Sequence, residues 1–247
     1  MRRITVIGAT SAIAEACMRL WCTEEPTTFV LVGRDPRALA AIAADLDVRG
    51  SAAGAAHIEV GRFGSAEEVA ATVGAALSHG VPDIALVAFG TLADQAELAR
   101  SPAALAATLE VNGTWPALCA QLLFNALRER GRGQLVLIGS VAGDRGRRSN
   151  YAYGSAKAML AAFAAGLQHL AASTAVQVLL VKPGPTDTPM TRAAGTSGSL
   201  ASADAVARTI VAGVHAGRPV IYAPARWRLI MAVIRALPRA IFNRLDI

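Results

Sequence analysis

Short apolar runs, many of them β-branched, alternate with alanine-rich stretches of helical length along this chain. The runs are almost continuously apolar, which is typical of strands buried on both faces of a parallel sheet. The predicted strands are Ile4–Ile7, Phe29–Val32, His57–Val60, Ile84–Ala88, Gln134–Ile138, Val176–Val181 and Val220–Tyr222. The predicted helices are Ala12–Trp21, Pro36–Asp45, Ala66–Ser78, Pro102–Arg130, Tyr153–Ala172 and Ala203–Ala216. This alternation predicts an α/β fold with a doubly wound parallel sheet in a single domain.

Composition narrows the class of protein. The 247 residues suit one domain with a sizeable core, and 53% hydrophobic against 17% charged residues excludes a disordered chain. The apolar run after the two N-terminal arginines has a strand's length and meets Gly8 at once, so we interpret it as the first strand rather than a signal peptide. No apolar run is long enough for a spanning helix. We therefore expect a cytoplasmic protein.

Cysteine, histidine and charge exclude further classes of site. Three cysteines without a CxxC pair are expected to be small buried residues, and the four histidines lack metal-ligand spacing. We predict no metal site. The net charge of +6 is concentrated at one end, because residues 226–247 contain five arginines and one aspartate. This distribution indicates a basic tail, and it does not indicate a groove for nucleic acid.

The first predicted strand runs into a turn of small residues, Gly8-Ala-Thr-Ser-Ala-Ile-Ala14. Such a turn places the amides of a helix N-terminus against a pyrophosphate and lets the backbone approach it closely. The usual glycine-rich pattern has glycine at positions 8, 12 and 14, whereas Ala12 and Ala14 stand here. Alanine at position 12 requires a negative φ or a slightly wider approach. The predicted dinucleotide-binding residues of this turn are Gly8, Thr10, Ser11, Ala12 and Ile13.

The ends of the second and fourth strands carry further binding candidates. Gly33 stands where an acid would bind a ribose 2′-hydroxyl, and Arg34 follows it. This pair favours NADP(H) over NAD(H). The alternative role for Arg34 is an exposed arginine that begins the next helix. After the fourth strand, Ala88, Phe89 and Gly90 are predicted to let the dinucleotide lie across the sheet edge.

Tyr153 and Lys157 lie four residues apart at the start of a long predicted helix, so they share one face. An ammonium beside a phenol favours phenolate and lowers its pKa from about 10, which makes the phenol a usable acid or base. The phenol can donate a proton to the carbonyl oxygen of a substrate as hydride reaches the carbon. Ser140, which ends the fifth predicted strand, can hydrogen-bond the same oxygen. Asn112, before Gly113, is predicted to hold a water that links Lys157 to solvent. The alternative role for Asn112 is a helix-breaking residue without catalytic work.

The segment after the sixth strand is predicted to fix the nicotinamide ring and to cover the substrate. Residues 184–202 are rich in Gly, Pro, Ser and Thr, which indicates a binding loop or lid. Its predicted binding residues, together with the proline that ends the strand, are Pro183, Gly184, Thr186 and Thr188.

Taken in this order, these residues resemble the short-chain dehydrogenase/reductase family over nearly the whole chain. The resemblance implies a Rossmann-type seven-stranded sheet, an NAD(P)-dependent oxidoreductase acting on CH–OH or C=O groups, and a dimer or tetramer built on the helices around Tyr153. Ala12, Ala14 and the Ala88-Phe89-Gly90 segment depart from the family pattern, which affects the expected cofactor affinity and leaves the reaction class unchanged.

A narrower resemblance rests on VAFGTLAD (87–94), SVAGDRGRRSNYAYGSAKA (140–158) and APARWRLIMAVIRALPRAIFNRL (223–245). These segments are similar to actinobacterial reductases of a 2-keto-erythro-pentose carried on decaprenyl phosphate. That resemblance implies a lipid-linked sugar substrate, a role in cell-wall arabinan synthesis, and a flavin-dependent oxidase as the partner that forms the ketone.

The basic tail, residues 226–247, adds physical support because 12 of the 16 residues from 227 to 242 are apolar and three of the others are arginines. Such a segment suits a helix lying on anionic lipid at the inner face of the membrane. Packing on the core or on another subunit is the alternative. Arg145, Arg147 and Arg148 follow the catalytic serine and are predicted either to bind a substrate phosphate or to form a solvated loop.

Three functional hypotheses follow. The first is a ketoreductase of a lipid-linked ketosugar, and the second is the same chemistry on a soluble alcohol or ketone with a purely structural tail. The third is a protein that senses the cofactor or acts as a scaffold without turnover. The complete set of Ser140, Tyr153 and Lys157 argues against the third.

Overall fold

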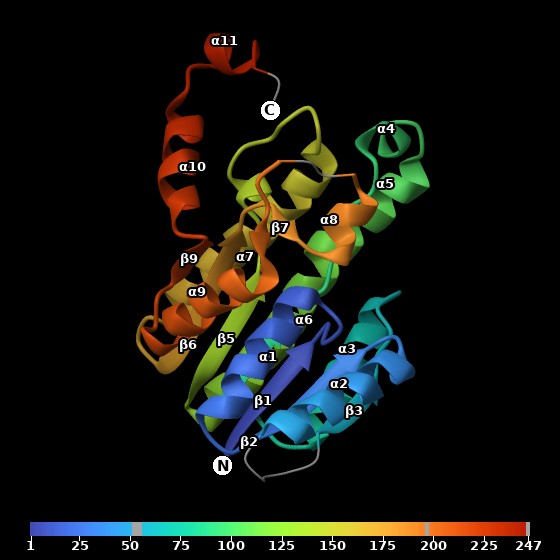
Figure 1. The fold of residues 1–247 in the computed structure, drawn as a ribbon, viewed down its shortest axis with the longest axis vertical. Coiled ribbons are helices and arrows are strands. Elements are labelled where there is room, and N and C mark those ends of the chain that lie inside the picture. Colours follow the sequence, from blue (N-terminus) through green and yellow to red (C-terminus); the bar gives the residue numbers. More distant parts are fainter. Residues whose placement is uncertain (51–55, 196–197, 246–247) are drawn as a thin grey trace.

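The computed structural model describes residues 1–50, 56–195 and 198–245, and within them the predicted doubly wound parallel sheet is confirmed. Seven parallel strands lie in the order β3-β2-β1-β4-β5-β6-β9 (Figure 1). The strands are β1 (Arg2–Ile7), β2 (Thr27–Gly33), β3 (His57–Val60), β4 (Ile84–Val87), β5 (Arg132–Ile138), β6 (Ala175–Pro183) and β9 (Val220–Ala223). The order reverses between β1 and β4, the place where ligands bind in such sheets.

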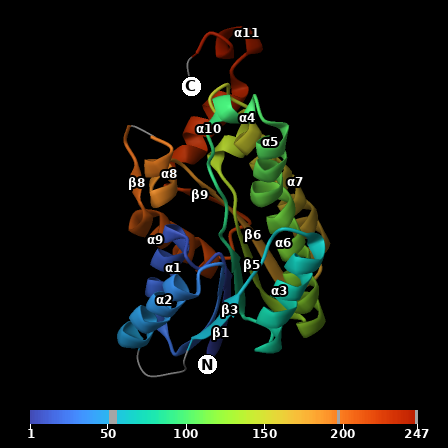
Figure 2. The same cartoon turned by 90° about the vertical axis from the view of Figure 1, so that its right-hand side faces the viewer.

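Helices cover both faces of the sheet. On one face lie α1 (Ala12–Glu24), α2 (Pro36–Arg49) and α9 (Ala203–His215) (Figure 2). On the other face lie α3 (Ala66–Ser78), α6 (Trp115–Arg130) and α7 (Tyr151–Ala171). Each layer forms its own hydrophobic core with the sheet. Each layer packs its alanine and aliphatic side chains against fully buried strand residues. This double coverage explains why the strands read as continuous apolar runs.

Local signals place the helix starts as predicted. The Asp35 carboxylate accepts hydrogen bonds from the first amides of α2, and Pro36 takes the first helical position. Ser101 accepts from the amide of Ala104 and caps α5 (Pro102–Leu109) in the same way. The short helix α4 (Gln95–Leu98) precedes α5.

The predicted helical stretch over 102–130 is interrupted near Asn112, where the sequence suggests a break before Gly113. A π-helical turn, Glu110–Thr114, separates α5 from α6. Gly113 in this turn lies against α7, where an added Cβ would come within 3.1 Å of the carbonyl oxygen of Ala156. The wide turn therefore allows close packing on α7, the helix that contains Tyr153 and Lys157, and it places Asn112 near that helix.

The stretch 184–202 is more regular than the sequence predicts. It contains α8 (Pro189–Ala193) and a two-stranded parallel ladder of β7 (Thr186–Asp187) with β8 (Ala201–Ser202). Thr188 and Thr191 form a capping box that fixes the start of α8. Residues 196 and 197 lie outside the described part of the chain.

The tail forms α10 (Arg226–Ala236) and α11 (Arg239–Phe242), which project beyond the carboxyl edge of the sheet (Figure 1). Within α10 only Met231 is buried, so the helix packs on the domain along one side and leaves most of its residues exposed. Across the described residues, each helix is too short or too polar to cross a bilayer. The last two residues of the predicted tail, 246 and 247, are outside the described ranges.

Candidate active site

A cavity of about 840 Å³ opens at the carboxyl ends of the central strands. Its lining includes all the predicted binding residues and three of the four predicted catalytic ones. These are Gly8, Thr10, Ser11, Ala12, Ile13, Arg34, Ala88, Phe89, Gly90, Ser140, Tyr153, Lys157, Pro183, Gly184, Thr186 and Thr188. The structure thus brings together residues from the ends of five strands and from α7, and their individual binding roles stay predictions.

The first turn is shaped by glycine at position 8. Gly8 has a φ of +86°, and a Cβ there would come within 2.7 Å of the amide nitrogen of Phe89. Either constraint alone would strain another residue. Ala12 is the first residue of α1 and has ordinary helical geometry. The alanine that departs from the glycine pattern is therefore accommodated without a positive φ.

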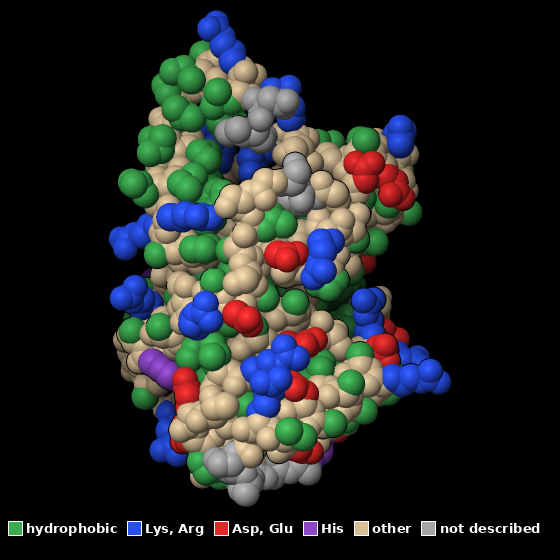
Figure 3. Space-filling model, viewed as in Figure 1, with side chains coloured by type: hydrophobic (Ala, Val, Ile, Leu, Met, Phe, Trp, Pro, Cys, Tyr) green, Lys and Arg blue, Asp and Glu red, His purple; other side chains and the backbone are tan. Residues whose placement is uncertain are grey.

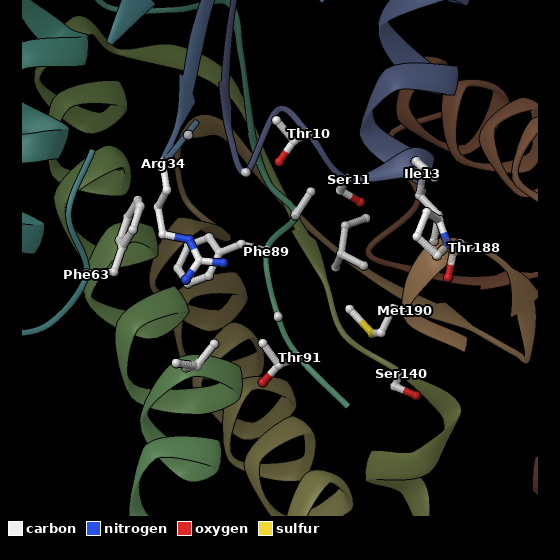
Figure 4. A pocket seen from close by; sticks show the side chains of 18 of the residues that line it. Thr10, Ser11, Ile13, Arg34, Phe63, Phe89, Thr91, Ser140, Thr188 and Met190 are labelled. Atoms are coloured by element: carbon white, nitrogen blue, oxygen red, sulfur yellow. The ribbon is translucent and has the colours of Figure 1, made fainter. Parts of the chain in front are cut away.

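Arg34, Phe63 and Phe89 form one end of the cavity (Figure 4). The two rings lie 4.7 Å apart between centroids, and the Arg34 side chain extends beside them. Arg34 is exposed and forms no ion pair within the described residues. An aromatic surface with an unpaired guanidinium beside it suits a flat base next to a phosphate.

Phe63 was missed by the sequence analysis, although Arg62 beside it also lines the cavity. The signal available was its place just after β3, because the carboxyl ends of parallel strands meet at one edge. Thr91 and Met190 also line the cavity and were missed. Each lies one or two residues beyond a segment that the sequence analysis had identified, after Gly90 and after Thr188.

Ser140 and Tyr153 face the other end of the cavity, from the end of β5 and from the first turn of α7. A hydrogen bond joins the two side chains, and the Ser140 hydroxyl also accepts from the amide of Ala142. Burial raises the pKa of Tyr153, and the bond to Ser140 opposes that shift. The lowering of the Tyr153 pKa that was predicted from Lys157 is therefore not found, and the phenol stays protonated and is an acid at neutral pH.

Lys157 is 3% exposed, and its Nζ donates to the carbonyl oxygen of Ile138 at 3.0 Å. Nζ lies 5.8 Å from the centroid of the Tyr153 ring. Burial without an acidic partner lowers the pKa of Lys157 to about 8. The ammonium is therefore charged at pH 7 and held close to the phenol, which is the predicted arrangement.

Asn112 is fully buried in the π-helical turn. Its Oδ1 accepts from the amide of Thr91 at 3.0 Å, and its Nδ2 donates to the carbonyl of Thr108 at 2.9 Å. A Cβ on Gly90 would come within 2.6 Å of Asn112 Oδ1 and 3.6 Å of Lys157 Nζ. Asn112, Gly90 and Lys157 therefore converge behind the cavity, and the proton-relay role of Asn112 remains a prediction.

Lys182, the second of the two lysines, has a structural contact. It forms an ion pair with Asp144, whose side chain is 2% exposed, and the Tyr222 hydroxyl donates to the same carboxylate at 2.7 Å. Burial and Asp144 raise the pKa of Tyr222 to about 12. Asp144 ends the short 3₁₀ turn that Ser140 caps, and this turn begins the loop of residues 140–150, here called the catalytic loop. The bonds of Asp144 therefore attach the catalytic loop to Lys182 in β6 and Tyr222 in β9.

Asp144→Ala should therefore lower the free energy of unfolding by about 3 kcal/mol, because it leaves Lys182 buried without a counter-charge. The matched control is Asp187→Ala, which removes an exposed ion pair with Arg192 and should change stability by less than about 0.5 kcal/mol. Urea unfolding followed by circular dichroism measures both. Equal effects would show that the Asp144 network is not an anchor.

Arg145 and Arg148 have contacts that the sequence analysis did not predict. The Arg145 guanidinium donates to the carbonyl oxygens of Ile234 and, at 2.8 Å, of Leu237, and it lies 3.7 Å above the Phe242 ring. Arg148 donates to the carbonyl oxygen of Leu245 at 2.8 Å. These two arginines hold the tail, which the sequence could not show because their partners lie about 90 residues away.

Comparison with known proteins decides the family. A family profile described as short chain dehydrogenase matches residues 2–197. The chain belongs to the short-chain dehydrogenase family. It is 33% identical over 246 residues to an uncharacterized oxidoreductase of Streptomyces coelicolor, covering 99% of this chain and 96% of that protein. Membership confirms the predicted class, an NAD(P)-dependent oxidoreductase.

Solved short-chain dehydrogenases share this fold at low sequence identity. One from Burkholderia cenocepacia, in complex with NADP, superposes with a TM-score of 0.82 at 20% identity, covering 100% of this chain and 98% of that one. One from Sphingobium yanoikuyae, in complex with NADPH, gives 0.79 at 21% identity, covering 97% and 98%. These likenesses confirm the single-domain Rossmann-type fold.

Proposed function

We propose that this short-chain dehydrogenase is an NADP(H)-dependent reductase of a ketosugar carried on a polyprenyl phosphate. The observation that carries the reductase assignment is the convergence of Ser140, Tyr153 and Lys157 on one cavity whose other end is built for a dinucleotide. The substrate class rests on the narrower sequence resemblance and on one arginine described below.

The residues present fit a nicotinamide dinucleotide. The Gly8 turn and the N-terminus of α1 offer amides to a pyrophosphate, and the contacting rings of Phe63 and Phe89 offer an apolar surface to a flat base. Pro183 and Gly184 would lie against the nicotinamide end. When bound, this group supplies the hydride that reduces the carbonyl carbon.

The chain itself supplies the proton and the orientation. Tyr153, kept protonated by burial, donates its proton to the carbonyl oxygen, and Ser140 donates a hydrogen bond to the same oxygen as charge develops there. The Lys157 ammonium stabilises the phenolate that remains. The Thr188 hydroxyl contacts Thr191 in the capping box of α8 and also lines the cavity, so its predicted contact with the nicotinamide end would use its remaining acceptor position.

Arg34 supports NADP(H) over NAD(H). Gly33 leaves room where an acid would repel a 2′-phosphate, and the Arg34 guanidinium at the cavity rim is available to bind one. The two similar structures described above, which contain NADP and NADPH, are consistent with this preference.

Arg34→Ala should weaken NADPH binding by about tenfold or more, since a charge-assisted hydrogen bond contributes about 1.5–3 kcal/mol. Binding of NADH should stay unchanged, because it lacks the 2′-phosphate. Fluorescence titration measures both, and Arg37→Ala, three residues further along α2 and outside the cavity lining, is the matched control. Equal affinity of the parent protein for NADPH and NADH would contradict the assignment.

Arg147 supports an anionic substrate. It lies in the loop between Ser140 and Tyr153, outside the lining of the cavity; its Nε is buried without a hydrogen-bond partner, and no acidic side chain in the described ranges pairs with it. Burial lowers the pKa of Arg147 accordingly. A desolvated guanidinium without a counter-charge is costly unless a ligand provides the anion. The phosphate of a lipid-linked sugar would provide it.

The test combines two substrates. Purified protein should oxidise NADPH in the presence of a polyprenyl-phosphate 2-ketopentose, and Arg147→Gln should raise KM for this substrate about tenfold. The same substitution should leave KM for a small uncharged ketone unchanged. Turnover of small ketones alone, with none of the phosphate-bearing substrate, would favour the alternative of a soluble substrate and overturn the lipid-linked one.

A further inference from the structure

Helix α10 has two apolar stripes on opposite faces. Along its 11 residues, one stripe consists of Trp227, Met231 and Ile234, spaced by four and three residues. The other consists of Leu229, Ala232, Val233 and Ala236, in the i, i+3, i+4, i+7 pattern of a continuous helical face. A helix packed on a single core needs only one such stripe. The second therefore requires its own explanation.

The inner stripe attaches the helix to the domain. Met231 is 2% exposed, and Trp227 packs so closely on Gly184 that a Cβ there would come within 2.0 Å of the indole nitrogen. A larger residue at position 184 would therefore collide with Trp227 of the tail, and Gly184 is also a predicted cofactor-binding residue. The projecting helix is consequently held at the edge of the active-site cavity, which Gly184 lines.

The outer stripe faces solvent. Leu229 is 72% exposed and Val233 55% exposed, while Ala232 and Ala236 between and beyond them are also exposed. Ile241, next to α10 in the short α11, is 52% exposed. Figure 3 shows hydrophobic side chains gathered along this projection with Lys or Arg side chains beside them. Such a concentration on a projecting element marks a binding surface.

This exposure is not the result of a frayed end. The carbonyl oxygens at the end of α10 are bound by Arg145, and that of Leu245 is bound by Arg148. The Arg145 guanidinium also stacks on Phe242 at 3.7 Å. Two arginines of the catalytic loop therefore hold the projection in place and leave its outer stripe uncovered.

The charges beside the outer stripe indicate which kind of surface it binds. Residues 226–245 contain five arginines and no acid, and the single acid of the tail, Asp246, lies outside the described residues. On a helical projection Arg226 falls on one side of the outer stripe, and Arg228 and Arg235 fall on the other. Apolar side chains flanked by arginines match a surface of acyl chains beneath anionic headgroups. A second copy placed face to face would instead bring like charges together.

We propose that the outer face of α10, continued by Ile241 and Leu245, docks on an anionic lipid membrane. Docking would place the cavity mouth next to the bilayer, where a lipid-linked substrate resides. Binding itself is measured without substrate or cofactor, so its result is distinct from that of the proposed reaction.

The test is co-sedimentation of the full-length protein with vesicles. Partitioning onto vesicles of phosphatidylcholine and phosphatidylglycerol should be at least about tenfold stronger than onto phosphatidylcholine alone, since each arginine near an anionic surface contributes about fivefold. The double variant Leu229→Ser, Val233→Ser should lose at least about tenfold of this partitioning. Arg226→Gln should lose about fivefold.

Val48→Ser is the matched control, because Val48 is 88% exposed on α2, far from the tail, and its replacement should leave partitioning unchanged. Thermal melting checks that each variant is folded. Absence of binding to the mixed vesicles, or equal binding by parent and double variant, would overturn the proposal. It would also be overturned if the double variant had a lower molecular mass than the parent in sedimentation velocity but bound the vesicles equally well. The outer face would then be an interface between two copies of this chain.

Discussion

Tyr153→Phe is expected to lower kcat for carbonyl reduction by about a thousandfold, the loss typical of a missing general acid. The ring and its packing remain, so only the proton donor is removed. Ser140 would still donate to the carbonyl oxygen, which accounts for residual turnover. Steady-state oxidation of NADPH, followed by absorbance, measures the effect. Binding of NADPH should be unaffected, because the phenol hydroxyl acts on the substrate.

Tyr151→Phe is the control for this substitution. Tyr151 lies two residues earlier in the same helix, is 46% exposed, and does not line the cavity. Its replacement should leave kcat and KM as they are. Turnover of Tyr153→Phe at the parent rate would show that another group protonates the oxygen.

Lys157→Met is expected to abolish turnover and to stabilise the fold. The ammonium is 3% exposed, and its one hydrogen bond in the described structure is to the carbonyl of Ile138. A methionine of similar length removes the desolvation cost that lowers the lysine pKa to about 8. After allowance for the lost hydrogen bond, we expect a gain of about 2 kcal/mol in unfolding free energy.

The pH dependence of that gain follows from linkage. Between pH 8 and the ordinary lysine value of 10.5, the unfolded chain binds the proton and the folded chain does not, so the stability of the parent rises with pH through this range. The advantage of Lys157→Met should therefore be largest below pH 8 and shrink above it. Urea unfolding at a series of pH values measures this. A variant less stable than the parent at pH 7 would contradict the account.

Periodicity and capping signals were sufficient for the sheet and most helices. The central strands are buried by local apolar sequence, and helices such as α2, α3, α5 and α9 start at a side-chain cap. The Tyr153–Lys157 pair was predictable for the same reason, since four residues along a helix determine which side chains share a face. The cavity lining followed from strand ends meeting at one edge.

Features that depend on distant partners were not predictable. The sequence indicated a break near Asn112, but the π-helical form of that break accompanies the close approach of Gly113 to α7, a contact that residues 102–130 do not reveal. The contacts of Arg145 and Arg148 with the tail depend on the path of α10. The pKa of Tyr153 was predicted from its neighbour alone, whereas burial, a property of the folded chain, controls it.

The most direct test of the reductase assignment follows the transferred hydrogen. The protein is incubated with NADPH deuterated at C4 of the nicotinamide and with the polyprenyl-phosphate 2-ketopentose or a small ketone. We predict that deuterium appears on the carbon that bore the carbonyl, on one face only, and that the new hydroxyl proton comes from solvent. Oxidation of NADPH that leaves the product carbon unlabelled would contradict hydride transfer to a carbonyl.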